Sequence, residues 1–305
     1  MSEKAQLVVE GKKLAVSNLN KVLYPKAGFT KGQVIDYYIR IAPVLLPHLR
    51  DRPLTMKRYP NGVDGEFFYE KNCPAHRPSW VKTAKVWSEG NQRDMYYCLA
   101  QDLPTLIWAA NLADLELHTS LARKKNVAQP TMMVFDLDPG PPADIVQCCQ
   151  VGLWLRDLLA EMKLRSFPKT SGSKGLQVYV PLNTAPTSFD ETKALSRALA
   201  EHLEREHGGL VVSKMLKALR GGKVLVDWSQ NDEHKTTVCV YSLRAKDEPT
   251  VSTPVSWDEV ENCLKKKAEL LKFRSDEVIA RVEKSGDLFS AVQELKQKLP
   301  KKWEL

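Results

Sequence analysis

Two aspartates one residue apart, Asp136 and Asp138, follow the apolar run Met132–Phe135, and the chain then turns at Pro139 and Gly140. Side chains alternate along a strand, so both carboxylates are expected on one face. Carboxylates this close repel each other, and burying either one costs free energy unless a cation compensates. Hard oxygen ligands suit Mg²⁺ or Mn²⁺. The pair therefore predicts a divalent-metal site, although a simple turn would suit the same residues.

A third acid, Asp227, ends the apolar run Val224–Val226 and precedes the polar residues 229–231. If this run forms a strand beside the first one, three carboxylates converge on one edge of a sheet. Such a ligand set can hold two divalent ions about 4 Å apart, the arrangement used for in-line phosphoryl transfer. The alternative is that Asp227 merely leaves a strand for a loop.

The stretch SGSKG at 171–175 predicts a phosphate-binding loop between two strands. Its glycines allow several backbone N–H groups to face one point, and Lys174 adds a full positive charge. Ser171 and Ser173 supply hydroxyl groups beside it. The spacing of a Walker loop is absent, and a polar hairpin turn remains the alternative.

Basic residues stand beside aromatic ones at 21–31, 57–59 and 67–71, and a further basic loop spans 214–223. Cations beside stacking faces are typical of grooves that bind nucleic acid. His118 and Arg244 each stand where a predicted strand ends, and each suits contact with a base, sugar or phosphate. Solvated surface charges, core aromatics and structural polar contacts are the alternatives.

The elements that must position these residues are helices and strands mixed along the chain. Apolar periodicity and capping residues predict helices at 30–49, 143–164 and 188–209, and a helix running into a strand at 103–118. A hairpin is predicted at 52–72, strand–loop–strand at 165–182, and strands at 222–230 and 235–244. From Trp257 the chain is predicted to be helical. This order indicates a mixed α+β fold, a single compact domain with a helical C-terminal tail at 257–305.

The composition is that of an ordinary soluble protein, with 305 residues, 43% hydrophobic and 27% charged. The net charge of +8 and the pI of about 9.0 favour polyanionic partners. The chain has no run of 18 apolar residues and no signal-peptide core at its start, so we expect a cytoplasmic protein without a membrane partner. None of the six cysteines forms a CxxC pair, and in a reducing compartment we expect no disulfide. Cys73 and His76 have metal-ligand spacing, but the sequence has no second pair of soft ligands to complete a zinc site.

Seven motifs occur in the order found in the polymerase domain of bacterial DNA ligase D: LNKVLYP, MKRYPNGVDG, FFYEKN, FDLDPG, TSGSKGLQVYVPL, KVLVDWSQN and KTTVCVYSLRA. The chain resembles that family over residues 14–287. The family belongs to the archaeo-eukaryotic primase superfamily and serves non-homologous end joining. The resemblance implies a primase-polymerase fold, a central sheet flanked by helices, over residues 1–305. Because no ligase or phosphoesterase motif is present, it also implies a stand-alone polymerase or an excised domain.

The activity implied by this resemblance is template-directed nucleotidyl transfer that fills short gaps at broken ends. Ribonucleotides are the implied preference over deoxynucleotides, and two divalent ions, Mn²⁺ or Mg²⁺, are the implied cofactors. The implied partners are DNA with a 5′-phosphate, NTP or dNTP, Ku, and a separate or fused DNA ligase. The implied localisation is cytoplasmic and nucleoid-associated.

Site residues carry over where the motifs match. The metal-binding catalytic carboxylates would be Asp136, Asp138 and Asp227. The residues at the incoming nucleotide would be Ser171, Ser173, Lys174, His118 and Arg244. The residues on DNA would be Lys21, Lys31 and Asn18 at the downstream 5′-phosphate, Phe68 and Tyr69 stacking on the template, Lys57, and Arg220 near the primer end. Two positions depart from the family pattern: Gln177 replaces a histidine, and Tyr69 replaces a phenylalanine.

Two other functions fit part of the pattern. A phosphatase of the haloacid dehalogenase type also has VFDLDPG at a strand end, with Asp136 as nucleophile and Asp138 as acid. That motif normally opens its fold, however, whereas here more than a hundred residues precede it. The other alternative is a non-catalytic nucleic-acid-binding module in which the acids are structural. Primer extension separates both alternatives from a polymerase.

Overall fold

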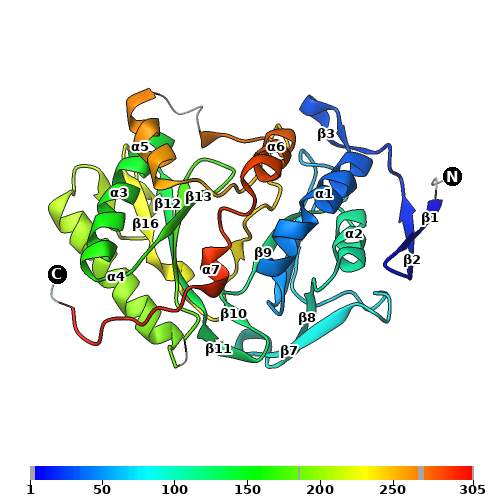
Figure 1. The fold of residues 1–305 in the computed structure, drawn as a ribbon, viewed down its shortest axis with the longest axis horizontal. Helices are drawn as coiled ribbons and strands as arrows, with labels where there is room; N and C mark the ends of the chain where they lie inside the picture. Colours follow the sequence, from blue (N-terminus) through cyan, green and yellow to red (C-terminus); the bar gives the residue numbers. More distant parts are fainter. Residues whose placement is uncertain (1–3, 185, 267–270, 304–305) are drawn as a thin grey trace. The chain divides into compact units, whose positions relative to one another are not determined.

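The computed structural model describes residues 4–184, 186–266 and 271–303 (Figure 1). The chain forms two compact units, and each is assembled from three separate stretches of sequence. Unit 1 comprises Met1–Lys125, Thr236–Val251 and Phe273–Asp287. Unit 2 comprises Asn126–Lys235, Ser252–Lys272 and Leu288–Leu305. The polypeptide therefore passes from one unit to the other five times.

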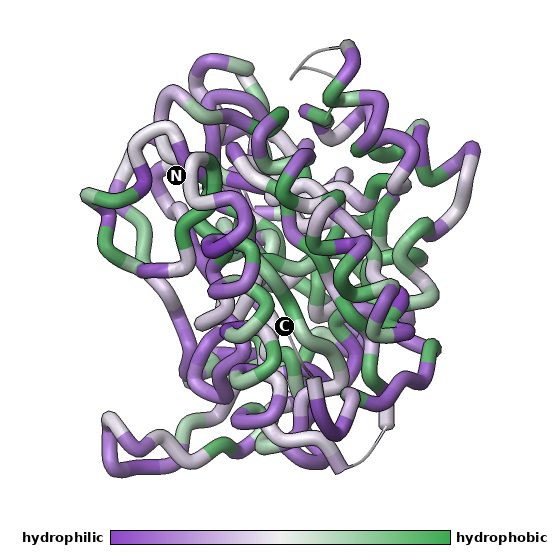
Figure 2. The backbone as a smooth tube through the Cα atoms, turned by 90° about the vertical axis from the view of Figure 1, so that its left-hand side faces the viewer, coloured by the Kyte–Doolittle hydropathy of each residue, from purple (hydrophilic) through white to green (hydrophobic). Residues whose placement is uncertain are grey.

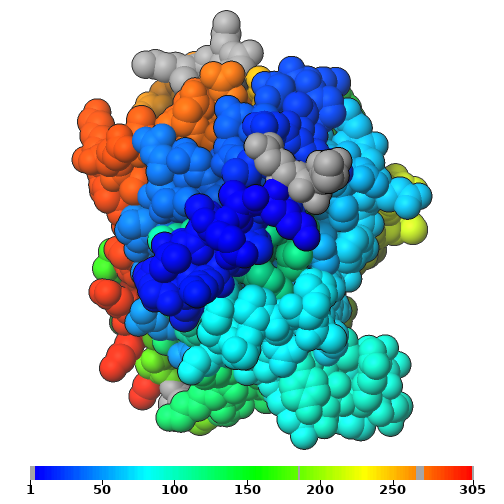
Figure 3. Space-filling view, turned by 90° about the vertical axis from the view of Figure 1, so that its right-hand side faces the viewer, coloured from blue at the N-terminus to red at the C-terminus, as the bar shows by residue number. Residues whose placement is uncertain are grey.

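Unit 1 is built on a six-stranded antiparallel sheet in the order β17-β9-β5-β8-β7, with β6 paired to β5. Its strands are β5 (Leu54–Arg58), β6 (Phe68–Glu70), β7 (Lys82–Ser88), β8 (Arg93–Leu99), β9 (Asp114–Thr119) and β17 (Thr237–Val238). The strands of unit 1 outside this sheet are β1 (Lys4–Val9), β2 (Lys12–Ser17), β3 (Val22–Tyr24), β4 (Phe29–Thr30) and β10 (Ala122–Arg123). The N-terminal strands (dark blue) and the β7–β8 hairpin (cyan) lie on the face shown in Figure 3.

The helices of unit 1 are α1 (Lys31–Leu49), α2 (Leu103–Asn111) and α6 (Ser275–Ser285). The start of α1 matches the prediction, because Thr30 and Gln33 form a capping box that satisfies free N–H groups of the first turn. Helix α1 contacts both α2 and α6. Near the end of α6, Asp287 accepts hydrogen bonds from Tyr241 at 2.7 Å and meets the buried His48 at 2.8 Å. These contacts attach the C-terminal segment to unit 1.

Unit 2 is built on a five-stranded mixed sheet in the order β13-β14-β12-β16-β15, in which only β15 and β16 run parallel. The strands of this sheet are β12 (Met132–Pro139), β13 (Phe167–Thr170), β14 (Leu176–Pro181), β15 (Val211–Val212) and β16 (Val224–Asp227), and β11 (Asn126–Pro130) lies outside it. Its helices are α3 (Ile145–Glu161), α4 (Phe189–Glu206), α5 (Trp257–Lys266) and α7 (Ala291–Glu294). Figure 2 shows hydrophobic stretches gathered along the inner strands and hydrophilic ones mainly in outer loops.

The register of this sheet confirms that the two acidic strands are neighbours. In the antiparallel β12–β16 pair, Asp136 lies directly opposite Asp227. Leu137 packs toward Gly152 of α3, so alternation along β12 puts Asp136 and Asp138 on the face away from that helix. The strand thus buries one side chain under a helix and presents the next on the opposite face.

Two glycines let loops approach the acidic end of β12. A Cβ on Gly140 would lie 2.0 Å from the backbone oxygen of Arg220, and one on Gly175 would lie 2.1 Å from that of Leu137. Hydrogen bonds hold the first contact, since Gly140 N donates to Lys223 O at 2.8 Å. Any larger residue would push the basic loop or the SGSKG loop away from the carboxylates.

The mixed α+β class is confirmed, and so are the long helices, but two expectations need correction. The strand predicted at 235–244 is only the two-residue β17, because Tyr241 adopts φ +65° and the chain turns there. Cys73 and Cys98 form a disulfide although none was expected, which also removes Cys73 as a zinc ligand. The disulfide was not visible in the sequence because only the folding of the loop after β6 onto β8 brings the two residues together.

The C-terminal segment contains three helices, as predicted, but residues 286–290 and 295–303 are not helical. Each helix packs on elements of its own unit rather than extending away from it. Helix α5 packs on α3, α6 on α1, and α7 on β14. Residues 267–270 of the predicted tail lie outside the described residues. Within the described part of the chain, no helix has the length and apolar character needed to cross a membrane. The domain bounds 1–305 and 257–305 stay predictions.

Candidate active site

The carboxylates of unit 2 share one region of its sheet, and each has its own hydrogen-bond donor. Asp138 meets Arg220 Nη1 at 3.3 Å. Asp227 accepts from the backbone and hydroxyl of Ser229 at 2.8 and 2.6 Å and from Gln230 Nε2 at 2.9 Å. Burial, then the charge of Asp227 and that of Asp138, raise the pKa of Asp136 to about 6. The three acids therefore repel one another, as the sequence predicts for an unneutralised metal site.

The fit of a metal ion rests on this repulsion and on donor chemistry. Among the described residues, no group of three or more His, Cys, Asp or Glu side chains is arranged closely enough to hold an ion. The donors are nevertheless all hard carboxylate oxygens, which suit Mg²⁺ or Mn²⁺. A divalent cation would relieve the repulsion that raises the pKa of Asp136. The residues present therefore fit such an ion by charge and ligand type.

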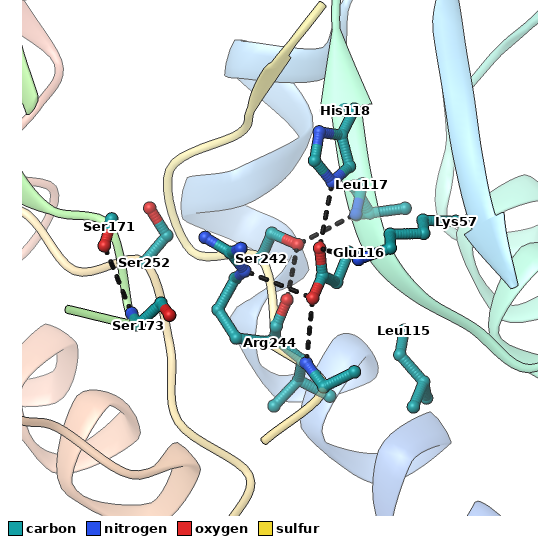
Figure 4. Close-up of polar contacts among 12 residues, drawn as sticks. Lys57, Leu115, Glu116, Leu117, His118, Ser171, Ser173, Ser242, Arg244 and Ser252 are labelled. Carbon is teal, nitrogen blue, oxygen red and sulfur yellow. Dashed lines mark hydrogen bonds and ion pairs between the residues drawn. The ribbon is translucent and has the colours of Figure 1, made fainter. Parts of the chain in front are cut away.

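The SGSKG loop joins β13 to β14 and is closed by its first serine. The buried Ser171 hydroxyl accepts from the N–H group of Ser173 at 3.2 Å (Figure 4). It also accepts from the N–H group of Gly175 at 3.1 Å. Gly172 has φ +70°, a conformation that glycine adopts without strain. Ser173 and Lys174 are exposed at the tip of the loop. Ser171 thus shapes the loop, and Ser173 and Lys174 are its accessible polar groups.

A buried lysine lies behind the carboxylates, beyond what the sequence predicted. Lys169 is fully buried and donates to Gln177 Oε1 and to Ser252 Oγ, each at 2.6 Å. The Gln177 side chain in turn hydrogen-bonds Asp136, which opposes the rise in the pKa of that carboxyl. The sequence offered one signal for this network, the glutamine at a position where the family pattern has histidine.

A second polar cluster belongs to unit 1 and centres on the buried Glu116 (Figure 4). Glu116 receives His118 Nε2 at 3.0 Å, Arg244 Nε at 3.3 Å and Lys57 Nζ at 3.5 Å, and it accepts from Ala245 N at 3.0 Å. Burial alone would raise its pKa, but the hydrogen bond from His118 and the charges of Arg244 and Lys57 bring it below the usual range. One carboxylate thus holds three basic side chains, an arrangement able to receive an anionic ligand.

The sequence missed Glu116, although it predicted His118, Arg244 and Lys57. Glu116 stands two residues before His118 on β9, and the spacing alone gave no reason to expect it to be buried. The burial of an acid in an apolar strand becomes visible only when the neighbouring strand β5 supplies Lys57 opposite it.

Exposed aromatic rings lie beside the cations of unit 1. Phe68 and Tyr69 on β6 are 44% and 54% exposed, so they are available for stacking. Lys57 Nζ lies 4.3 Å from the ring centroid of Phe67, and the Arg58 guanidinium lies 5.1 Å from that of Phe68. Cations beside accessible rings are what single-stranded nucleic acid requires of a protein surface.

A third group of cations surrounds the start of α1. Lys31 is the first residue of that helix, and its N–H donates to Lys21 O at 2.8 Å. Burial, then the charges of Lys21 and Arg58, lower the pKa of Lys31 to about 8. Lys21 Nζ lies 3.2 Å from Asn61 Oδ1, and the exposed Asn18 occupies the turn before it. Cations held this close favour an anion at the same place.

The predicted residues thus fall into sets within each unit. Unit 2 brings the three carboxylates together with Arg220, which was predicted near a primer end and here pairs with Asp138. Unit 1 gathers His118, Arg244 and Lys57 on Glu116, and separately Lys21 with Lys31.

Comparison with known proteins gives a consistent result. The family model described as LigD, primase-polymerase domain, matches residues 30–289. The chain is 41% identical over 280 residues to the multifunctional non-homologous end joining protein LigD of Mycolicibacterium smegmatis, covering 91% of this chain and 36% of that protein. It is 33% identical over 274 residues to the bifunctional LigD of Bacillus subtilis, covering 90% and 43% respectively. The chain thus spans less than half the length of these relatives.

Among solved structures, the polymerase domain from Mycobacterium tuberculosis ligase D in complex with DNA matches with a TM-score of 0.85 and 39% identity. The match covers 93% of this chain and 99% of that one. The fold and these matches together define a primase-polymerase domain, a nucleotidyltransferase-type enzyme. The chain belongs to the LigD primase-polymerase domain family.

Proposed function

We propose that this chain adds nucleotides to a primer end under the direction of a DNA template, filling gaps and extending broken ends in non-homologous end joining. The observation that carries the proposal is the β12–β16 register, which sets Asp136 opposite Asp227 with Asp138 on the same face. The relatives from Mycolicibacterium smegmatis and Bacillus subtilis are end-joining proteins, which supports this pathway. Ku and a DNA ligase are the partners proposed with it.

Asp136, Asp138 and Asp227 would hold two divalent ions, Mn²⁺ or Mg²⁺. Such ions, when bound, lower the pKa of a primer 3′-hydroxyl and neutralise triphosphate charge. The protein's own task is to keep three mutually repelling carboxylates on one face of the sheet, which the strand register accomplishes. Arg220, paired with Asp138 at 3.3 Å, would lie near the primer end.

The incoming nucleotide is proposed to be an NTP in preference to a dNTP. Ser173 and Lys174 on the loop shaped by Ser171 would contact the triphosphate, and their donors would stabilise charge on the departing pyrophosphate. His118 and Arg244 would contact the nucleotide as well, held in orientation by Glu116. Because Glu116 is buried, it acts through these two residues.

The DNA is proposed to follow the basic and aromatic surface of unit 1. Lys21 and Lys31 would bind the downstream 5′-phosphate with the help of Asn18. The exposed rings of Phe68 and Tyr69 would stack on the template, beside Lys57.

The test is primer extension on a gapped duplex with a 5′-phosphorylated downstream strand, comparing NTP with dNTP and Mn²⁺ with Mg²⁺. Template-dependent addition is expected, fastest with NTP and Mn²⁺. Asp136→Ala should reduce addition to background while binding of the 5′-phosphorylated DNA, measured by fluorescence anisotropy, stays within about twofold. A parallel loss of DNA binding and activity would contradict this division of roles, and DNA binding without addition by the wild type would favour the non-catalytic module.

A further inference from the structure

We infer that Gln177 is a positioning residue for the metal-binding carboxylates: it ties Asp136 to the buried cation Lys169 and so fixes the orientation of that carboxylate. The inference rests on the proposed function, because it assigns Gln177 a purpose within the same site. It concerns an amide at a position where the family pattern has histidine.

The strands β13, β14 and β12 are neighbours in the sheet of unit 2. Gln177 pairs with Lys169 on one side and with Asp136 on the other, so all three side chains lie in one row across the sheet. Cross-strand partners are close enough for their side chains to interact. The row places an amide between a cation and a carboxylate.

The two hydrogen bonds of the Gln177 amide have opposite directions. Gln177 Oε1 accepts from Lys169 Nζ at 2.6 Å, so its remaining polar atom, Nε2, is the donor toward Asp136. An ionised carboxylate accepts only, so this bond favours its charged form. The amide therefore relays the positive charge of Lys169 to Asp136 while adding no charge of its own.

Burying the Lys169 ammonium group costs free energy. Lys169 is fully buried, and an isolated buried ammonium group is strongly disfavoured. Two contacts stabilise the buried Lys169 Nζ: Ser252 Oγ lies 2.6 Å from it, and the centroid of the Tyr179 ring lies 5.4 Å from it. The Ser252 hydroxyl in turn donates to Thr170 O at 3.0 Å. A charge held by this many groups has a fixed position, and through Gln177 it gives Asp136 a fixed orientation.

The fixed orientation of Asp136 should increase the affinity of the site for a metal ion. Residues that orient metal ligands by hydrogen bonds typically alter metal affinity or activity 10- to 100-fold when they are replaced. Gln177→Met keeps the length and burial of the side chain but removes both hydrogen bonds. We expect the dissociation constant for Mn²⁺, measured by electron paramagnetic resonance of free Mn²⁺ without nucleotide or DNA, to rise about tenfold. Binding of 5′-phosphorylated DNA should not change.

A set of variants separates positioning from packing. Lys169→Met should weaken Mn²⁺ binding similarly, and the double variant should be no weaker than Lys169→Met, because Lys169 acts through Gln177. Gln177→His keeps one donor and one acceptor and should restore most of the affinity. Gln101→Met is the matched control: it removes an amide that donates to Asp51 Oδ1 at 2.7 Å, a carboxylate that is not one of the proposed metal ligands, and it should leave Mn²⁺ binding unchanged.

The outcomes are distinct. Unchanged Mn²⁺ affinity in folded Gln177→Met overturns the inference while leaving the proposed polymerase intact. Absence of Mn²⁺ binding and nucleotide addition in the wild type overturns both. If Gln177→Met does not fold, Gln177→Asn takes its place, because its amide is one methylene too short to reach both neighbours. Wild-type Mn²⁺ affinity in Gln177→Asn would then overturn the inference, and weakened affinity would support it.

Discussion

At the scale of single residues, the sharpest prediction concerns Lys31. Its pKa is lowered to about 8 by burial first and then by Lys21 and Arg58, so the free protein loses this charge as pH rises through about 8. In the role proposed for Lys31, a 5′-phosphate would bind the charged form. We therefore expect the preference for 5′-phosphorylated over 5′-hydroxyl gapped DNA to be full at pH 7 and to fall between pH 8 and 9, as measured by fluorescence anisotropy.

The variant Lys31→Met should lose about tenfold of that preference at pH 7, the effect of one charge-assisted hydrogen bond, and should show no fall at higher pH. Lys26→Met is the matched control. Lys26 is an exposed lysine already paired with Asp247 at 2.7 Å, so its loss should leave the preference intact. A pH-independent preference in the wild type would exclude Lys31 as the phosphate ligand.

Residue types with an evident chemical use were predictable from the sequence, whereas their buried partners were not. Asp136, Asp138 and Asp227 stand out because acids end apolar runs. Glu116 and Lys169 are equally polar but sit within strands, and nothing local indicates whether such a side chain reaches solvent. Their roles become visible only when neighbouring strands bring Lys57 to Glu116 and Gln177 to Lys169.

At the scale of elements, local signals predicted the helices better than the strands. Thr30, Asp144 and Ser188 each cap a helix with a complete capping box, a signal contained within four residues. The alternation of apolar and polar residues in TVCVYSL predicted a long strand, but Tyr241 leaves the extended conformation with φ +65°. Its hydroxyl bonds Asp287 instead, a partner 46 residues away that no local pattern reveals.

A prediction at this scale concerns the turn beside Asp138. In Gly140→Ala the added Cβ would lie 2.0 Å from the backbone oxygen of Arg220, so the basic loop has to move. We expect a loss of about 1–3 kcal/mol in the free energy of unfolding, typical of overpacking, together with reduced nucleotide addition. Urea unfolding and primer extension measure the two effects. Gly209→Ala, where a Cβ meets nothing within 4 Å, should change neither. Wild-type behaviour of Gly140→Ala would show that this loop yields freely.

At the scale of the whole molecule, each unit combines three separate stretches of the chain. The amino-acid composition did not reveal this division. No change of composition marks the five crossings, because each unit carries the same mixture of apolar strands and charged loops. The predicted helical tail, 257–305, divides between the units: α6 belongs to unit 1, whereas α5 and α7 belong to unit 2. This segment therefore contributes core to both units.

That role predicts the effect of truncation. A chain ending at Lys272 loses Asp287, the partner of His48 and Tyr241, and loses the carbonyls of Val292 and Leu295 that accept from Asn183. It also loses four side chains that are at most 5% exposed: Val278, Ile279, Phe289 and Val292. Each is worth about 1.5–3 kcal/mol when fully buried. Their sum of roughly 6–12 kcal/mol matches the total stability of a typical protein of about 5–15 kcal/mol.

We therefore expect the chain ending at Lys272 to show no cooperative thermal unfolding by circular dichroism, and no nucleotide addition. A chain ending at Lys298 is the control. It retains Gln297, whose amide bonds Arg165 and Pro181 of unit 2, and should unfold at the wild-type temperature. Hydrogen exchange resolves the two units: loss of protection in both α1 and β14 is expected for the shorter chain, since α6 contacts the first and α7 the second. Full protection of either element would mean that its unit keeps a sufficient core without the C-terminal segment.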